Sequence, residues 1–329
     1  MQQDARFKGF NFGFQVAPDG EAEPLPHAVA DGAGGKWVWI SLDPAGAGTR
    51  EWLAKDAGLD EQVVNALLAV DTRPRCLVSN AGALLILRGV NPDPKARPTD
   101  LVSVRLWIEN DRIITVQYRP LASIDQLRQA YEQGTGPKNP AELVVALAHG
   151  MIERMRTLVH TYESEIDRLE DESLTGTLPD LRQRLNTVRH DIVPLRRYLA
   201  PQRDAFVGLI TARLDWLDDW WQSHLREIAD EVGRHIDALD AIREAAHIVQ
   251  DTLNTRIAER TNKMLVILSI GAAAFLPLNL LVGLLGSNVA GIPGAQHPYA
   301  FWGVTGVLAL ILVIEFVIYR SLRLSRLMR

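Results

Sequence analysis

The sequence predicts a membrane protein of mixed α+β class, with an N-terminal α/β domain, a long helical stalk and two C-terminal transmembrane helices. The first observation behind this prediction is a stretch of 51 residues, 264–314, that contains no Asp, Glu, Lys or Arg. The second is a proline-free run, 217–263, whose apolar residues recur every three or four positions. The third is a set of short β-rich runs within residues 1–135. Helices and strands differ in hydrophobic period, so the three patterns separate the three parts.

The N-terminal part, 1–135, is expected to fold as a cytosolic α/β domain. Within it Val102, Val104 and Leu106 alternate with Ser103 and Arg105, which is typical of a strand with one buried face. The expected strands are 37–42, 75–79, 83–89, 101–108 and 112–118, and the expected short helices are 51–57 and 61–69.

The residue types that would indicate an enzyme are missing from this pattern. There is no phosphate-binding P-loop, no dinucleotide-binding glycine fingerprint and no His-Glu-x-x-His zinc motif. The eight histidines are scattered, and the single cysteine, Cys76, excludes an intrachain disulfide. We therefore expect neither an enzyme nor a resident cofactor.

The charge of the soluble part bears on its partners. Residues 1–263 hold 39 acidic and 31 basic side chains, a formal net charge of −8. An acidic surface disfavours nucleic acid, whose phosphates need basic partners, and it is compatible with attracting cations. The first residues lack the apolar core of a signal peptide, so we expect this part to stay in the cytosol.

The second part, 136–263, is expected to be a bundle of helices that ends in one long helix. The periodic runs 140–174 and 179–200 predict an antiparallel pair. Beside them a helix is predicted from residue 217, and no strong helix breaker precedes the first apolar run. A continuous helix of nearly 70 residues would be about 100 Å long. It would link the cytosolic part mechanically to the membrane.

Two apolar runs, 264–286 and 301–319, are expected to cross the membrane as helices, joined by an outer loop over 287–300. At about 1.5 Å per residue they span about 34 Å and 28 Å, enough for a hydrocarbon core of about 30 Å. Arg256, Arg260 and Lys263 precede the first run, four arginines lie in the tail 320–329, and the link has no basic residue. The positive-inside rule then places both termini in the cytosol and the link outside, in an inner or plasma membrane.

Two helices cannot enclose a path for a polar solute, so a path requires several copies of the chain. The first run carries a suitable face at steps of three or four residues: Asn262, Leu265, Ser269, Ala272, Leu276, Asn279, Gly283 and Gly286. Asn279 in mid-membrane is costly facing lipid and favourable facing water or another helix. The face therefore either lines a pore or packs helix against helix.

Two further residues in and near the membrane are candidates for chemistry. His297 lies in the outer link, where an imidazole suits zinc. Glu315 is the one acidic residue of the membrane region. It either reaches the cytosolic interface, where it pairs with a cation such as Lys263 or Arg320, or serves as a carboxylate linked to proton movement.

Gly286-Ser287-Asn288 stands at the outer end of the first predicted span, in the place of the Gly-Met-Asn that marks the CorA superfamily of divalent-cation transporters. The chain resembles this superfamily and, within it, the ZntB zinc-transporter branch. Ser287 departs from the methionine of CorA and from the aliphatic residue usual in ZntB. The matching membrane segments are Phe275-Leu-Pro-Leu278, Gly283-Leu-Leu-Gly-Ser-Asn288 and Gly291-Ile-Pro-Gly294. The matching cytosolic segments are Asp31-Gly-Ala-Gly-Gly35, Trp39-Ile-Ser-Leu-Asp43, Thr72-Arg-Pro-Arg75, Leu87-Arg-Gly-Val-Asn91 and Pro201-Gln-Arg-Asp204.

This resemblance implies a CorA-like funnel, a homopentamer whose first span forms the pore. It implies that Asn288 presents a ring of amide oxygens at the outer mouth, and that Gly286 lets the copies approach closely. The transported ion would be Zn²⁺, entering with protons. The other ions that such a transporter could carry are Mg²⁺, Co²⁺, Ni²⁺ and Cd²⁺.

Two alternatives remain beside zinc transport. One is a CorA-like channel for magnesium, cobalt or nickel, against which the missing methionine and the Gly-Ile-Pro segment argue. The other is a membrane-anchored cytosolic sensor or scaffold, in which the apolar hairpin serves only as a tether. The polar face around Asn279 argues against a pure tether.

Overall fold

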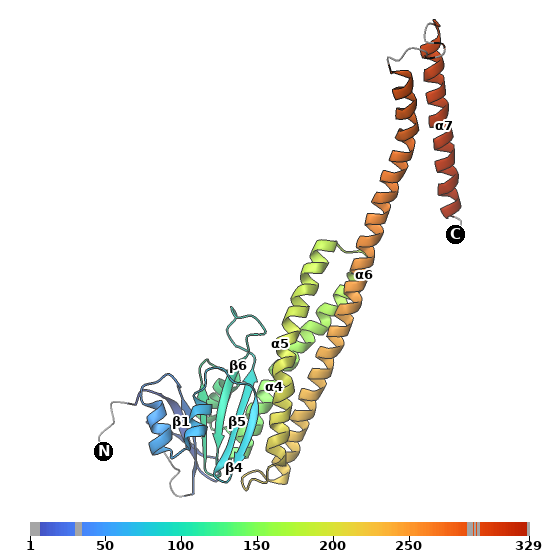
Figure 1. Cartoon of the computed structure of the whole chain (residues 1–329). Helices are drawn as coiled ribbons and strands as arrows, with labels where there is room; N and C mark the ends of the chain where they lie inside the picture. The colour runs from blue at the N-terminus through green and yellow to red at the C-terminus, as the bar shows by residue number, and fades with distance from the viewer. Residues whose placement is uncertain (1–6, 30–34, 288–291, 293, 295–296, 328–329) are drawn as a thin grey trace. The chain divides into compact units, whose positions relative to one another are not determined.

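The computed structural model describes residues 7–29, 35–287, 292, 294 and 297–327, with the side chains of the last helix described through Val317. The chain divides into two compact units, Met1–Thr252 and Leu253–Arg329. Unit 1 contains a sheet and the helices that cover it, and unit 2 contains two apolar helices (Figure 1). Each unit is described by itself below.

The described residues of unit 1 form one seven-stranded sheet in the order β2-β1-β3-β7-β6-β5-β4. All neighbouring strands are antiparallel except β3 and β7, which are parallel. The strands are β1 (Phe10–Val16), β2 (Ala22–Pro24), β3 (Trp37–Leu42), β4 (Arg75–Ser79), β5 (Gly82–Gly89), β6 (Val102–Ile108) and β7 (Arg112–Gln117). The hairpin predicted at Asn110-Asp111 is confirmed as the connection of β6 and β7.

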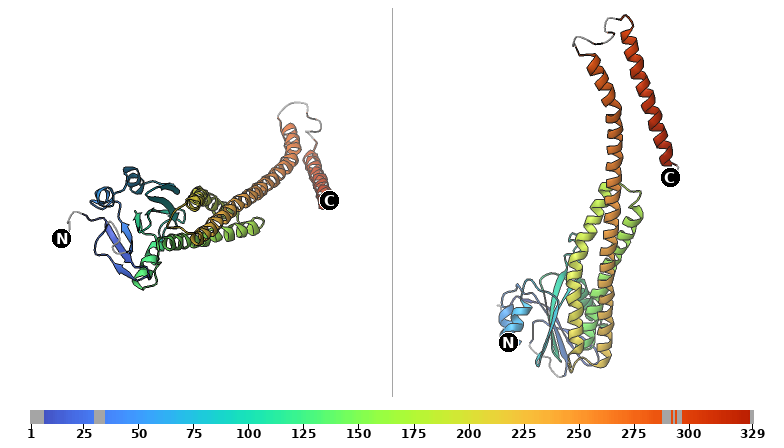
Figure 2. Two further views of the ribbon diagram at one scale, coloured as in Figure 1. Left: turned by 90° about the horizontal axis from the view of Figure 1, so that it is seen from below. Right: turned by 45° about the vertical axis from the view of Figure 1, so that its right-hand side comes forward.

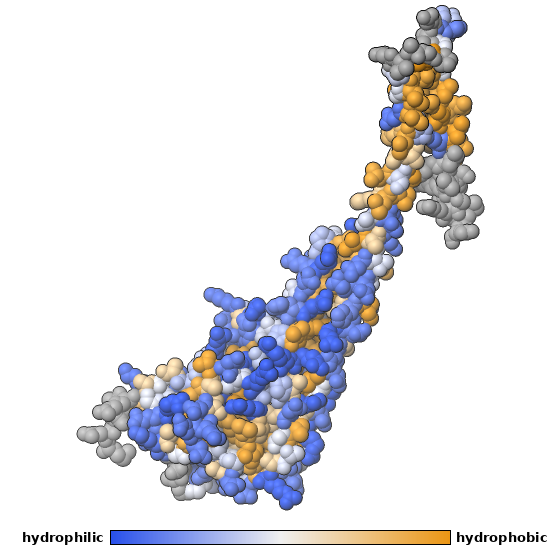
Figure 3. All heavy atoms as spheres, in the orientation of Figure 1, coloured by the Kyte–Doolittle hydropathy of each residue, from blue (hydrophilic) through white to orange (hydrophobic). Residues whose placement is uncertain are grey.

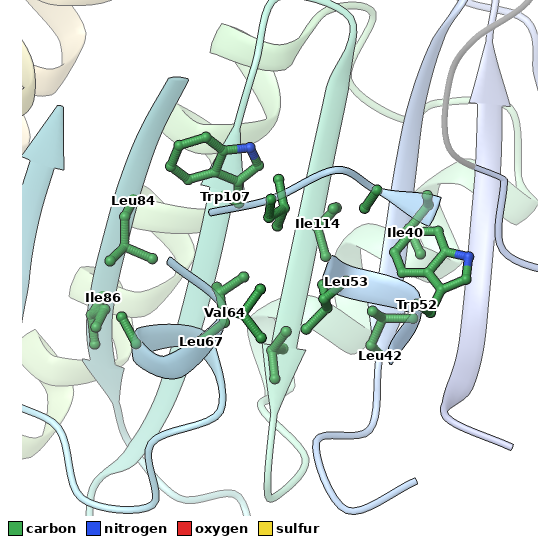
Figure 4. Close-up of a cluster of buried hydrophobic side chains, with 14 of the residues drawn as sticks. Ile40, Leu42, Trp52, Leu53, Val64, Leu67, Leu84, Ile86, Trp107 and Ile114 are labelled. Carbon is green, nitrogen blue, oxygen red and sulfur yellow. The ribbon is translucent and has the colours of Figure 1, made fainter. Parts of the chain in front are cut away.

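One face of the sheet is covered by short helical segments: α1 (Thr49–Glu51), the π-helical turn η1 (Trp52–Asp56) and α2 (Glu61–Leu67). Trp52, Leu53 and Leu67 pack here against side chains of β5 and β7 such as Ile86 and Ile114 (Figure 4). These side chains are all buried, and their burial is what fixes the short segments on the sheet.

Longer helices cover the opposite face: α3 (Ala122–Glu132), α4 (Pro140–Glu172) and α5 (Leu178–Thr211) (Figure 2). A Cβ added to Gly89 of β5 would lie 2.8 Å from Leu121 and 3.2 Å from Met151 of α4, so the sheet meets this layer closely. The start of α4 is capped by Asn139, whose side chain accepts from the Glu142 N–H at 2.8 Å.

Helix α6 (Asp219–Leu285) is continuous over 67 residues, which confirms the predicted long helix. Its part in unit 1 lies beside α4 and α5, and Arg196 of α5 holds Asp240 of α6 at 2.7 and 3.0 Å. The apolar seam predicted for this part is confirmed by the burial of Leu225, Ile228, Val232, Ile236, Leu239, Ile242, Ala246 and Val249.

The second apolar helix, α7, covers Ala300–Leu327. Both α6 and α7 are long and apolar enough to cross a membrane, with hydropathies of 2.3 and 2.2 in the most apolar window. These two helices confirm the two predicted spans as helices.

Three elements were not predicted: β1, β2 and α3. The alternation of Phe10, Phe12 and Phe14 was the signal for β1, but Gly13 obscured it. The prediction that the second stalk helix ends at residue 200 was wrong, because α5 continues through Pro194 and Pro201 to Thr211. A proline removes one backbone hydrogen bond, and α5 is held in place by buried side chains such as Phe206 and Leu209.

Candidate functional site

The apolar part of α6 turns one narrow face toward α7. Among the described residues of this part, Gly271, Ala274, Leu278 and Leu281 are half-buried and their neighbours are exposed. The half-buried positions of α7 are Val304, Leu308, Ile311 and Glu315, also at steps of three and four. Leu281, Val304 and Leu308 line a common cavity of about 490 Å³, so these two faces meet. Figure 3 shows that the visible surface of both helices is mostly hydrophobic, with smaller hydrophilic patches.

The polar face predicted on the first span lies on the opposite side of α6. Successive residues of a helix turn by about 100°, so Asn279 lies about 80–100° around the axis from Gly271 and Leu278, and about 140–160° from Ala274 and Leu281. Ser269 stands in the same relation to Gly271 and Ala274. Asn262, Ser269, Asn279 and Gly283 are all exposed in the single chain. Helix α7 therefore leaves this face without a partner.

This arrangement has an energetic consequence for Asn279. Its amide stands among exposed apolar residues such as Leu276 and Leu280, which are 68% and 63% exposed. An amide that faces hydrocarbon has lost its hydrogen bonds to water, which costs several kcal/mol (about 2–7). The cost is avoided when the face meets water or the same face of other copies. The face was predicted either to line a pore or to pack against another helix. Because α7 packs elsewhere, both interpretations now need further copies of the chain.

The end of α6 holds two of the predicted site residues. Gly286 donates its N–H to the Val282 carbonyl at 2.8 Å, and the Ser287 hydroxyl donates to the Leu284 carbonyl at 2.8 Å. A Cβ added to Gly286 would lie 2.8 Å from the Val282 oxygen, so a side chain here would strain the last turn. Asn288, predicted to follow at the mouth, lies outside the described residues.

His297 lies on the α7 side of the hairpin. It lines the cavity that contains Leu281 and Val304, on the side of α6 away from Asn279. Its Nδ1 accepts from the Tyr299 N–H at 3.3 Å, so in the neutral ring Nε2 carries the proton. A metal that binds His297 would have to displace either the proton on Nε2 or the hydrogen bond at Nδ1. In the described part of the chain, no three His, Cys, Asp or Glu side chains are close enough to hold a metal together.

Glu315 shares the inward face of α7. It is half-buried, and its Oε2 has no hydrogen-bond partner among the side chains that the structure describes. No ion pair with Lys263 is present in that same set. The side chain of Arg320, the other expected partner, lies beyond Val317.

Aromatic side chains gather where α7 begins. Tyr299, Phe301 and Trp302 are 71%, 73% and 69% exposed. Aromatic residues are enriched where a membrane helix meets the headgroup region. This end of the hairpin therefore has the composition expected at a membrane surface.

Unit 1 contains a large cavity that the sequence did not reveal. It has a volume of about 1060 Å³, and four arginines line it: Arg88, Arg97, Arg119 and Arg197. They come from separate segments of the chain that only the fold brings together. Arg88 lies in Leu87-Arg-Gly-Val-Asn91, one of the segments that carry the family resemblance, but no sequence pattern links it to the other three arginines.

Comparisons with known proteins give a consistent result. The family model described as "CorA-like Mg2+ transporter protein" matches residues 34–320. The divalent cation transporter CmaX of Pseudomonas aeruginosa is 36% identical over 289 residues, which are 87% of this chain and 87% of that protein. The zinc transport protein ZntB of Pectobacterium carotovorum is 32% identical over 267 residues, 81% of each protein.

Solved structures agree with the sequence comparison. The structure of full-length CmaX superposes with a TM-score of 0.82 at 34% identity, covering 98% of this chain and 100% of that one. The CorA magnesium transporter from Methanocaldococcus jannaschii gives a TM-score of 0.80 at 17% identity, covering 94% and 96%. The second likeness bears on the fold alone. Together they confirm the predicted architecture of an α/β domain, a long helix and two apolar helices.

Proposed function

The chain belongs to the CorA family of transporters, and from this premise we propose that it carries divalent metal cations across a membrane. The observation that carries the proposal is the polar face of α6 on the side away from α7. Several copies that turn this face toward a common axis would enclose a path lined by amides and hydroxyls. By family resemblance the assembly is a homopentamer.

The proposed path suits a cation that keeps part of its water shell. Amide and hydroxyl oxygens such as those of Asn279 and Ser269 replace outer water molecules without binding the ion tightly. Gly283 adds no side chain and lets helices approach closely, which narrows the path near its end. By resemblance, Asn288 would add a further ring of oxygens beyond Ser287.

We propose zinc as the principal ion. Support comes from the ZntB relatives, whose printed name is zinc transport protein and which cover 81% of this chain. Magnesium is the alternative, supported by the description of the family model. Ser287 adds a hydroxyl oxygen at the end of α6, a ligand type that hard cations such as Mg²⁺ prefer.

The proposed membrane is an inner or plasma membrane, with both ends of the chain in the cytosol. The basic residues before the first span and in the tail support this orientation. The proposed coupling group for protons is Glu315, because its carboxylate lies on the inward face of α7 without a described partner.

Flux measurements test the proposal directly. The purified chain is placed in liposomes that contain a zinc-sensitive or a magnesium-sensitive dye, with and without a proton gradient. Zinc entry that increases with an inward proton gradient supports zinc transport with protons. Magnesium entry that ignores the gradient favours the channel, and no entry of either ion favours a tethered sensor or scaffold.

The role of Glu315 is tested in the same liposomes with Glu315→Gln. The amide keeps the size and loses the titrating group, so zinc entry is expected to lose its dependence on the proton gradient. Unchanged dependence in this variant removes Glu315 from the coupling and leaves the transport proposal intact.

A further inference from the structure

The arginine-lined cavity of unit 1, called the arginine cavity below, lies where the residues after α2, the end of β5, the start of β6 and helix α5 meet. Arg88 on β5 and Ser103 on β6 are register partners and both line it. Tyr118, which follows β7, and Val193 on α5 line the cavity too. Its volume of about 1060 Å³ is at the upper end of the range typical of small-molecule sites, roughly 300–1,000 Å³.

One arginine of the cavity is held rigidly. Arg88 donates to the Thr72 carbonyl at 2.8 and 3.1 Å, to the Leu101 carbonyl at 3.2 Å and to Asp71 at 3.1 Å. Its guanidinium also lies 4.2 Å from the centre of the Tyr198 ring. The side chain is 12% exposed, so it is a fixed positive charge in the wall. Its partner Asp71 is 94% exposed. Solvent screens this ion pair, so Asp71 offsets only part of the positive charge of Arg88.

Two other arginines are available to a ligand. Arg119 and Arg197 are exposed, and neither forms an ion pair with a carboxylate within the described part of the chain. Arg197 lies 5.0 Å from the centre of the Tyr198 ring, which orients its planar group. The fourth, Arg97, pairs with Asp100 at 3.2 Å. The cavity thus holds four guanidinium groups and two carboxylates.

A fifth guanidinium lies behind the wall. Arg105 on β6 is fully buried, with its guanidinium 4.9 Å from the centre of the Tyr118 ring. Its Nη2 donates to the Ala69 and Val70 carbonyls, at 2.6 and 3.3 Å, but its Nε and Nη1 have no partner among the described residues. Burial is the main cause that lowers the pKa of Arg105, and the charge of Arg88 lowers it further. A buried cation that lacks a counter-ion raises the positive potential on this side of the sheet.

Part of the remaining wall of the cavity is apolar. Val70, Leu101, Val193 and Pro194 line it beside the tyrosine rings. Guanidinium groups bind phosphate through paired N–H donors, and apolar walls bind a flat hydrophobic group. A bare phosphate would satisfy the arginines and leave most of the volume unfilled.

We propose that the arginine cavity binds a phosphorylated small molecule with a flat apolar portion, the chemical class of the nucleoside phosphates. The phosphates contact Arg119 and Arg197 near Arg88, and the flat portion lies on the apolar wall. The site lies wholly within unit 1 and gives the cytosolic part a ligand other than the transported ion. It does not rest on the proposed transport, because binding requires no metal.

Binding is tested by calorimetry on the full chain in detergent, with EDTA present so that no metal bridges ligand and protein. The probes are ATP, AMP, pyrophosphate and inorganic phosphate at low salt. ATP is expected to bind at least tenfold more tightly than inorganic phosphate, about 1.4 kcal/mol. Added salt is expected to weaken binding because the contacts are ionic.

Variants locate the site. Arg119→Ala and Arg197→Ala are each expected to weaken ATP binding about tenfold, since each removes a charge-assisted contact to phosphate. Arg213→Ala, at an exposed position outside the cavity, is the matched control and leaves the affinity unchanged. All three side chains are exposed, so melting temperature and oligomer size should be unaltered, which shows that the variants fold.

Three results overturn the proposal. They are the absence of saturable ATP binding at millimolar concentration, equal affinity for ATP and inorganic phosphate, and ATP binding that both cavity variants leave unchanged. Zinc or magnesium flux in liposomes is measured separately on the same protein. Loss of the ligand proposal therefore leaves the transport proposal to stand or fall on its own data.

Discussion

Asn279 is a polar residue whose amide lies among apolar side chains on α6. It is exposed on the face away from α7, between exposed leucines. Sequence periodicity predicted that the polar and small residues share one side of the helix, because a helix repeats every 3.6 residues and the apolar run has no interruption that shifts the phase. The sequence did not show where α7 packs, since α7 is apolar on all sides. The contact between the two helices emerges only from the burial of small residues such as Gly271 and Ala274.

The first prediction concerns this residue. Asn279→Leu is expected to lower cation flux in liposomes by about tenfold or more, because a hydrogen bond to a charged group contributes about 1.5–3 kcal/mol and each 1.4 kcal/mol is a factor of ten. The variant should fold and insert at least as well as the original chain, since leucine is the better residue toward lipid.

Thr305→Leu is the matched control for Asn279→Leu. Thr305 is an exposed polar residue of the other apolar helix, and its hydroxyl is already bonded to the Phe301 carbonyl at 2.9 Å. Flux through this variant is expected to be normal. Equal flux through both variants would show that the polar face of α6 does not line the path.

At the scale of elements, the bundle of α4, α5 and the first part of α6 is held mainly by its apolar seam. Leu239 lies in the middle of that seam and is 1% exposed. The ion pair of Arg196 and Asp240 lies next to it at the surface, with side chains 46% and 38% exposed. Exposed pairs of this kind contribute about 0–1 kcal/mol, so the seam dominates.

The second prediction follows from this difference. Leu239→Ala is expected to destabilise unit 1 by about 2–5 kcal/mol, because it leaves a cavity between the helices. Leu174→Ala, at a position 71% exposed, should change stability by no more than about 0.5 kcal/mol. Denaturant unfolding followed by far-ultraviolet circular dichroism compares the two variants, and similar midpoints would contradict the seam as the main source of stability.

The long helix shows how far element prediction reaches. Between Asp219 and Leu285 the sequence has no glycine–proline cluster and a steady period, and α6 runs through as predicted, including Pro277. The same rule misplaced the end of α5, because buried contacts outweigh the two prolines inside it. The edge strand β2 was missed since its three residues are too few for a clear period, and β1 was missed because Gly13 obscures its alternation.

At the scale of the whole molecule, a single chain exposes two kinds of surface that no single solvent suits. The apolar surface of α6 and α7 is unfavourable in water, and the polar face of α6 is unfavourable in lipid. The exposed apolar residues of α6 and α7 are suited to contact with lipid, whereas the polar face of α6 is suited to contact with other copies of the chain. The sequence predicted the need for copies from the polar face. The arginine cavity was out of reach, because Arg88, Arg119 and Arg197 meet only after three separate segments have folded together.

The third prediction is the assembly itself. In mild detergent the chain is expected to have a mass several times its 36.6 kDa, and five times by family resemblance. Native mass spectrometry measures the number of copies directly. A monomer under conditions in which liposome flux is retained would exclude a shared path, whereas another multiple would alter only the symmetry.

The aromatic cluster at the start of α7 has a consequence for the lipid that surrounds the protein. Tyr299, Phe301 and Trp302 are exposed residues of the types that hold the end of a membrane helix at the level of the headgroups. A helix pair held at one surface meets a thicker or thinner bilayer by changing its tilt, at a cost of a fraction of a kcal/mol per ångström. In the proposed assembly, a change of tilt rotates the face that carries Asn279 relative to its copies. Membrane thickness is then a variable that sets the width of the path, independently of the ion and of unit 1.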